Sequence, residues 1–171
     1  SMRRVIEFIA SDYRRYRIWL RRTKAGKRAY DVLIYVDDSE SMAESGAGTM
    51  ALEALALLSS ALSRLEVGRV GVESFGTNAK LLHKLDAGTG PNGPKLVSSL
   101  TFKQKETNMR KMLEFSLETL DEARRTSLDL DAQLAQLLLI ISDGKLDDRE
   151  RIQSLVRQAA TKRQMIAFFL I

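Results

Sequence analysis

Residues 31–42 read DVLIYVDDSESM, and this stretch decides the fold. The five consecutive apolar residues at 32–36 are typical of a β-strand that is covered on both faces. The run stops at Asp37 and Asp38, and Ser39 and Ser41 follow at once. A buried strand gains nothing from so polar an end, so we expect these side chains to hold a ligand.

Composition and length limit the class of protein. A chain of 171 residues with 44% hydrophobic and 29% charged residues is typical of one soluble globular domain. Cysteine is absent, which excludes disulfides and thiolate metal sites and favours a reducing compartment. No run reaches about 18 consecutive apolar residues and no secretory signal pattern is present. We therefore expect no contact with a membrane.

The basic character of the chain is concentrated in residues 1–28. Ten Lys or Arg residues stand there against two acidic ones, a net charge of +8, whereas the remainder of the chain carries −3 of the total +5. We expect an amphipathic helix in this basic arm, with Val5, Ile6, Ile9 and Tyr13 turned toward a domain formed by residues 29–171. RNA contact through the basic face of the arm is the alternative.

After the arm, short β-type runs alternate with longer helical patterns. Strands are predicted at residues 30–36, 69–75, 80–85, 136–141 and 165–171, and helices at 49–66, 108–125 and 147–162, with a loop at 87–94 and a short helix at 95–100. This order predicts an α/β three-layer sandwich with a mostly parallel central sheet and helices on both faces. The link between the second and third strands is short, so we expect an antiparallel edge strand.

Three polar segments are expected at the carboxyl ends of the strands, where open α/β sheets bind ligands. They are residues 37–41, the Ser-Asp-Gly at 142–144, and Glu106-Thr107-Asn108 before a helix. Carboxylates and hydroxyls are hard oxygen donors, which favour Mg²⁺, Mn²⁺ or Ca²⁺ over zinc. We expect a divalent ion to relieve the repulsion among Asp37, Asp38 and Asp143. Such residues also serve as turn formers and helix caps, so each segment alone is weak evidence.

The spacing D-x-S-x-S after the first strand, a loop threonine and an aspartate after the fourth strand resemble the metal-ion-dependent adhesion site (MIDAS) of von Willebrand factor A domains. A more specific resemblance covers the chain from about Val5 to Ile171. Its blocks are RIWLRRTKAGKRAYDVLIYVDDSESM, LEALALLSSALSRLEVGRVGVESFG, AKLLH, FKQKET and AQLLLIISDG. They are similar to the C-terminal MIDAS domain of the midasin family, giant AAA-type ATPases of large-subunit ribosome assembly.

The resemblance implies a metal site and a partner-binding rim. Its metal ligands would be Asp37, Ser39, Ser41, Thr107 and Asp143, around Mg²⁺ with Mn²⁺ or Ca²⁺ as alternatives. The rim would be formed by Glu40, Met42, Asn108 and Gly144.

The same resemblance implies a partner and a place of action. A glutamate from the ubiquitin-like domain of a WD-repeat ribosome-assembly factor would complete the coordination of the metal. The ATPase motor elsewhere in the parent protein would then pull that factor from the pre-60S particle, in the nucleolus and nucleoplasm. The domain itself would be a binding module and not an enzyme, and the chain has no G-x-x-x-x-G-K-[ST] phosphate loop.

Two departures from the family pattern lead to further expectations. Relatives have a longer segment after Gly144 and a further helix after the last strand, so we expect the domain to be truncated and the last strand to have an uncovered flank.

An enzymatic alternative is a haloacid-dehalogenase-like phosphotransferase with Asp37 as nucleophile. That chemistry requires an acidic residue two positions later, where Ser39 stands. Asp38 should point elsewhere by strand alternation.

Overall fold

The computed structural model describes residues 30–86, 90–105, 107–126, 134–144 and 149–171. The basic arm at residues 1–28 and the residues directly after Gly144 lie outside this range. The packing of the arm on the domain, and its contact with RNA, therefore stay predictions.

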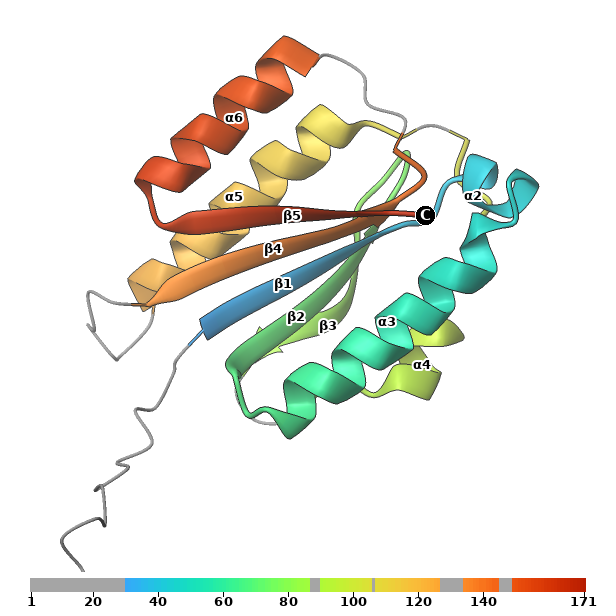
Figure 1. Cartoon of the computed structure of the whole chain (residues 1–171), viewed down its shortest axis with the longest axis horizontal. Coiled ribbons are helices and arrows are strands. Elements are labelled where there is room, and N and C mark those ends of the chain that lie inside the picture. Colours follow the sequence, from blue (N-terminus) through green and yellow to red (C-terminus); the bar gives the residue numbers. More distant parts are fainter. Residues whose placement is uncertain (1–29, 87–89, 106, 127–133, 145–148) are drawn as a thin grey trace, which may run out of the picture.

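A five-stranded sheet forms the centre of the fold (Figure 1). Its strands are β1 (Tyr30–Asp37), β2 (Gly68–Phe75), β3 (Lys80–Asp86), β4 (Ala135–Ser142) and β5 (Gln164–Leu170). They lie in the order β3-β2-β1-β4-β5. Only the β2–β3 pair is antiparallel, so the predicted parallel sheet with an antiparallel edge strand is confirmed.

Helices cover both faces of the sheet. Figure 1 shows α5 (Met109–Thr126) and α6 (Arg149–Thr161) on one face, and α3 (Ala47–Arg64) with the short α4 (Gly93–Val97) on the other. Two hydrophobic clusters fill the interfaces between these layers. One includes Leu55 of α3 with Val32 and Ile34 of β1, and the other includes Leu113 of α5 with Leu33 and Tyr35. Alternate side chains of β1 thus enter opposite cores, as expected for a strand with two covered faces.

One short helix was not predicted. Helix α2 (Glu40–Glu44) follows β1 directly, where the sequence predicts only a tight loop. Its five residues are too few to show a helical period. The short helix predicted at residues 95–100 ends three residues earlier, as α4 (Gly93–Val97), and the other elements agree with the prediction within about two residues at each end.

The outer strand β5 exposes apolar side chains. Met165 is 55% exposed, Phe169 41% and Leu170 65%, in agreement with the expected uncovered flank. Across the part of the chain that the structure describes, no helix has both the length and the apolar character needed to cross a bilayer.

Candidate metal centre

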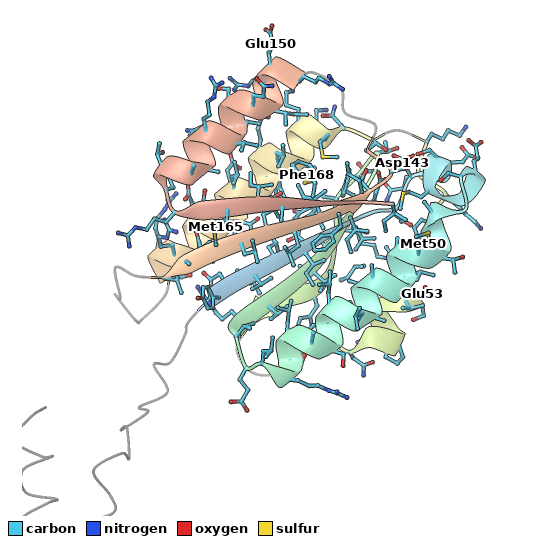
Figure 2. All side chains as sticks on the ribbon, in the orientation of Figure 1. Met50, Glu53, Asp143, Glu150, Met165 and Phe168 are labelled. Carbon is cyan, nitrogen blue, oxygen red and sulfur yellow. The ribbon has the colours of Figure 1, made fainter. Side chains whose placement is uncertain are left out.

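The parallel strands bring the predicted polar segments to one edge of the sheet. β1 and β4 pair in parallel up to Val36 and Ile141, so Asp37 and Ser142 end adjacent strands side by side. Figure 2 shows Asp143 beyond the end of β4, at the same edge as α2, whereas Met165 lies toward the opposite end of the sheet. The sequence prediction that these strand ends meet is therefore confirmed.

Asp37 is completely buried at this edge and is fixed through both carboxylate oxygens. Its Oδ1 accepts a hydrogen bond from the backbone N–H of Ser39 at 3.0 Å, and its Oδ2 accepts one from the Ser142 hydroxyl at 2.8 Å. The first bond closes the turn that leads into α2, and the second joins two strands. Together they hold the carboxylate in one orientation, and because both donors are neutral they leave its negative charge uncompensated.

The two serine hydroxyls of the D-x-S-x-S motif lie next to each other. Ser39 Oγ and Ser41 Oγ share a hydrogen bond of 3.0 Å, and Ser39 is buried whereas Ser41 is half-buried. Two oxygens at neighbouring corners of an octahedral Mg²⁺ site, each at about 2.0–2.1 Å from the ion, would be separated by about 3 Å. The two hydroxyls are hydrogen-bonded to each other here, and they lie close enough to serve as adjacent ligands of one small cation.

Burial and charge both act on Asp37. Burial raises the pKa of the Asp37 carboxyl above its ordinary value, hydrogen bonds from Ser39 and Ser142 partly offset this, and the nearby charge of Asp143 raises the pKa further. Within the described part of the chain, no cationic side chain is among the causes of this shift. The strand ends therefore hold two carboxylates that a positive ion would stabilise.

Thr107 reaches the same edge through its neighbours in the chain. Gln104, three residues earlier, forms an isolated parallel β-bridge with Ser39 and accepts a hydrogen bond from the Glu40 N–H at 2.7 Å. Three residues of backbone span at most about 10 Å, so the backbone of Thr107 lies within about that distance of Gln104. The N-terminal cap of α5 is the neighbouring Asn108, whose Oδ1 accepts from the Lys111 N–H at 3.0 Å. The threonine is thus not required as that cap.

Asp38 does not belong to the charge cluster, so the predicted repulsion with Asp37 and Asp143 is wrong in this respect. Its carboxylate turns to the opposite side and accepts hydrogen bonds from the backbone N–H groups of Thr101 at 2.7 Å and Phe102 at 2.5 Å. The Gln104 side chain donates to it as well, at 3.2 Å. Asp38 therefore fastens the segment that leads to Thr107 onto the end of β1.

The predicted rim needs one correction. Met42 is fully buried in the core on the α3 side, because α2 turns this residue inward, and it cannot touch a partner. Glu40 is exposed, Asn108 is exposed as well, and Gly144 is half-buried in a left-handed turn with φ +84°. These three residues remain available at the rim.

The donor set depends on hydroxyl groups. Among the residues that the structure describes, no three His, Cys, Asp or Glu side chains gather into a metal-binding group. A cation here would be held by two carboxylates and by neutral Ser and Thr oxygens, which are hard donors suited to Mg²⁺, Mn²⁺ or Ca²⁺.

Comparison with known proteins agrees with the resemblance seen in the sequence. Midasin of Dictyostelium discoideum is 40% identical over 173 residues, covering 100% of this chain and 3% of that protein. Midasin of Giardia intestinalis is 39% identical over 166 residues, covering 96% of this chain and 3% of that protein. The chain thus spans only a small part of the length of these relatives.

Solved structures share the fold at low sequence identity. The crystal structure of manganese-loaded TRAP protein of Plasmodium vivax has a TM-score of 0.69 at 20% identity, covering 85% of this chain and 58% of that one. Proximal thread matrix protein 1 of the mussel byssus has a TM-score of 0.62 at 15% identity, covering 82% and 36%. Residues 32–145 match the family described as the von Willebrand factor type A domain. This chain belongs to the von Willebrand factor type A domain family, and its similarity to midasin extends over its whole length.

Proposed function

We propose that this domain docks a partner protein through a divalent cation held by Asp37, Ser39, Ser41, Thr107 and Asp143. The observation that carries the proposal is that the Ser39 and Ser41 hydroxyls lie 3.0 Å apart at the strand end that also holds Asp37 and Asp143. Family membership and the position of the site at the carboxyl ends of parallel strands support it.

Each residue of the set has a distinct task. The Ser39 and Ser41 hydroxyls supply neutral oxygens, so the total negative charge of the ligands stays low. Asp37 is fixed by the Ser39 N–H and the Ser142 hydroxyl, and it supplies charge from a constant position. A divalent ion bound in this way would offer an electrophilic coordination position to a carboxylate of the partner.

Mg²⁺ is the cation that we propose, with Mn²⁺ and Ca²⁺ as alternatives. Carboxylate and hydroxyl oxygens are hard donors that suit all three ions, and Mg²⁺ is the one that the resemblance to the midasin family implies. The TRAP protein that shares this fold is described as manganese-loaded, which supports a divalent metal as a class.

The partner that we propose is the ubiquitin-like domain of a WD-repeat ribosome-assembly factor, which would present a glutamate to the metal. The support is the similarity to midasin over the full chain. In this proposal the domain binds the factor in the nucleus. An AAA motor in another part of the parent protein then releases the factor from the pre-60S particle.

A binding role agrees better with the site than phosphoryl transfer does. The haloacid-dehalogenase alternative lacks an acid two residues after Asp37, and the neighbouring Asp38 is occupied by backbone N–H groups of residues 101 and 102. A carboxylate that accepts such bonds is poorly placed to donate a proton to a leaving group.

Titration calorimetry with the ubiquitin-like domain of such a factor tests the proposal. We expect binding in Mg²⁺, loss of binding in EDTA, and loss on Ser41→Ala or on replacement of the partner's glutamate by alanine. Ser154→Ala, at an exposed position of α6, is the matched control and should bind as the unmodified chain does. Equal affinity in Mg²⁺ and in EDTA would refute metal-dependent docking.

A further inference from the structure

A basic hollow lies beside the candidate metal centre. It has a volume of about 590 Å³ and is lined by Thr77, Asn78, Lys80, Lys103, Gln104 and Lys105. Three of these six residues are lysines, and no acidic side chain is among the described residues that line it. We call this surface the lysine hollow.

The lysine hollow is continuous with the proposed metal ligands. Gln104 belongs to its lining and also pairs with Ser39 as a β-bridge. On the other side, the N–H of Asp38 donates to the carbonyl of Phe75 at the end of β2, just before the Thr77 and Asn78 that line the hollow. A partner whose carboxylate reached the serine hydroxyls would therefore cover the hollow as well.

Hydrogen bonds of the Gln104 side chain fix the backbone segments that carry the lysines. The Gln104 side chain donates to the Asp38 carboxylate at 3.2 Å and accepts from the Asn78 N–H at 2.9 Å, so it joins the two segments that line the hollow. Gly76 permits this close contact, because a Cβ there would lie 2.6 Å from the Cβ of Gln104. Binding would thus require little ordering of the backbone, which lowers the entropic cost of association.

Gln104 turns inward, whereas Lys103 and Lys105 on either side of it are exposed. The third lysine, Lys80, is also exposed and makes only a long contact of 3.5 Å with the carbonyl of Ser99. Three ammonium groups without a carboxylate among the described residues of the hollow favour anionic groups of a ligand.

We infer that the lysine hollow is a second subsite, which receives further acidic side chains of the same protein partner. This inference rests on the proposed function, because the metal position selects the first carboxylate and the hollow then favours partners with more acidic residues around it. A protein is a better fit than RNA, because no aromatic side chain for base stacking is among the described lining residues.

Two capped peptides of equal length test the inference. One carries a single glutamate among glycines and glutamines, and the other has two of the neighbouring glutamines replaced by glutamate. Their affinities for the ¹⁵N-labelled chain are measured from amide chemical shifts, in Mg²⁺ and in EDTA. We expect the triglutamate peptide to bind roughly fivefold tighter in Mg²⁺, since each exposed ion pair adds a small increment.

Substitution of the three lysines tests whether they cause the tighter binding of the triglutamate peptide. Lys80→Gln, Lys103→Gln and Lys105→Gln together should remove the advantage of the triglutamate peptide and leave the single-glutamate peptide with its original affinity. The double variant Lys84→Gln and Lys95→Gln, at exposed positions outside the hollow, should retain the advantage. An equal affinity of the two peptides for the unmodified chain, or an advantage that survives the triple substitution, would overturn the inference.

The same measurements separate this inference from the proposed function. Lysine-dependent binding of the triglutamate peptide that persists in EDTA would support the hollow and contradict metal-dependent docking. Mg²⁺-dependent binding of both peptides with equal affinity would support docking and contradict the hollow. A short oligouridylate that displaced the triglutamate peptide at lower concentration than the peptide itself would show an RNA surface instead, and would also overturn the inference.

Discussion

The hydroxyl of Ser142 donates a hydrogen bond of 2.8 Å to the carboxylate of Asp37, although 105 residues separate the two in the chain. This bond joins the ends of β1 and β4 at the point where the proposed cation would bind. It also leaves Asp37 with one fixed orientation in a completely buried position. Ser142 is therefore expected to act on the metal through Asp37.

Ser142→Ala should weaken Mg²⁺ binding without unfolding the domain. Loss of a hydrogen bond that orients a metal ligand lowers metal affinity by about 10- to 100-fold. The accompanying loss of stability should be about 1–3 kcal/mol, because a buried acceptor loses its partner. Calorimetric Mg²⁺ titration and urea unfolding measure the two effects, with the exposed Ser98→Ala as control. Unchanged Mg²⁺ affinity in Ser142→Ala would contradict this role.

Asp38→Ala should loosen the segment that leads to Thr107. Two backbone N–H groups, at residues 101 and 102, would lose their acceptor, and Phe102 holds a left-handed conformation with φ +51° that this contact stabilises. We expect a loss of about 2–4 kcal/mol in the free energy of unfolding and weaker Mg²⁺ binding. Glu44→Ala, an exposed change in α2, is the control. If Asp38→Ala kept the free energy of unfolding of the unmodified chain, the conclusion that Asp38 holds this segment in place would be wrong.

A buried pair on the α5 side of the sheet should make stability depend on pH. The Tyr35 hydroxyl donates a hydrogen bond to Glu73, and both residues are buried. Burial raises the pKa of Glu73 above its ordinary value of 4.5, although the bond from Tyr35 partly lowers it. The folded state therefore holds the Glu73 proton more tightly than the unfolded state, so stability should fall as pH rises from 4.5 through the raised pKa.

Glu73→Gln removes this titrating carboxyl group and should weaken the dependence of the free energy of unfolding on pH. Free energies of unfolding in urea between about pH 4 and pH 8 would show a smaller decline than in the unmodified chain. Glu53→Gln, on the exposed side of α3 (Figure 2), should leave the decline as it is. A decline of the same size in Glu73→Gln would show that this carboxyl is not responsible.

An ion pair at the opposite end of β1 should affect stability alone. Asp31 is completely buried and accepts from Arg69 at 2.7 and 2.8 Å and from the Gln136 side chain at 3.0 Å. Asp31→Ala removes the carboxylate partner of Arg69, which still donates to the Ala123 carbonyl, and should cost about 3–5 kcal/mol. The site at Asp37 lies roughly 20 Å away along the strand, so the folded variant should bind Mg²⁺ normally. Reduced Mg²⁺ affinity in the folded fraction would contradict the independence of the two ends.

Residue patterns were sufficient for the sheet and for the place of the site. Continuous apolar runs at residues 32–36 and 137–141 identify strands with two covered faces, and the carboxyl ends of parallel strands lie at one edge by topology. Residue order alone thus places Asp37, Ser39 and Asp143 together. The structure confirms that placement.

Side-chain direction within the site could not be predicted in the same way. The inward turn of Met42 depends on α2, which is too short to show a helical period. Alternation places Asp38 opposite Asp37, but its partners at residues 101 and 102 are more than 60 positions away and no local pattern points to them. The pairing of Tyr35 with Glu73 likewise depends on the registry of β1 and β2. The one available signal was Glu73, a charged residue among the buried residues of β2.

The most direct test of the central claim is electron paramagnetic resonance of Mn²⁺ titrated into the chain. Free Mn²⁺ gives a strong six-line signal that binding diminishes, so the titration counts sites without any partner. We predict one site per chain, displaced by excess Mg²⁺, and loss of that site in a Ser39→Ala, Ser41→Ala double variant that still folds by circular dichroism. A free-ion signal that grows in proportion to added Mn²⁺ from the first addition, or a site that survives the double substitution, would contradict the account.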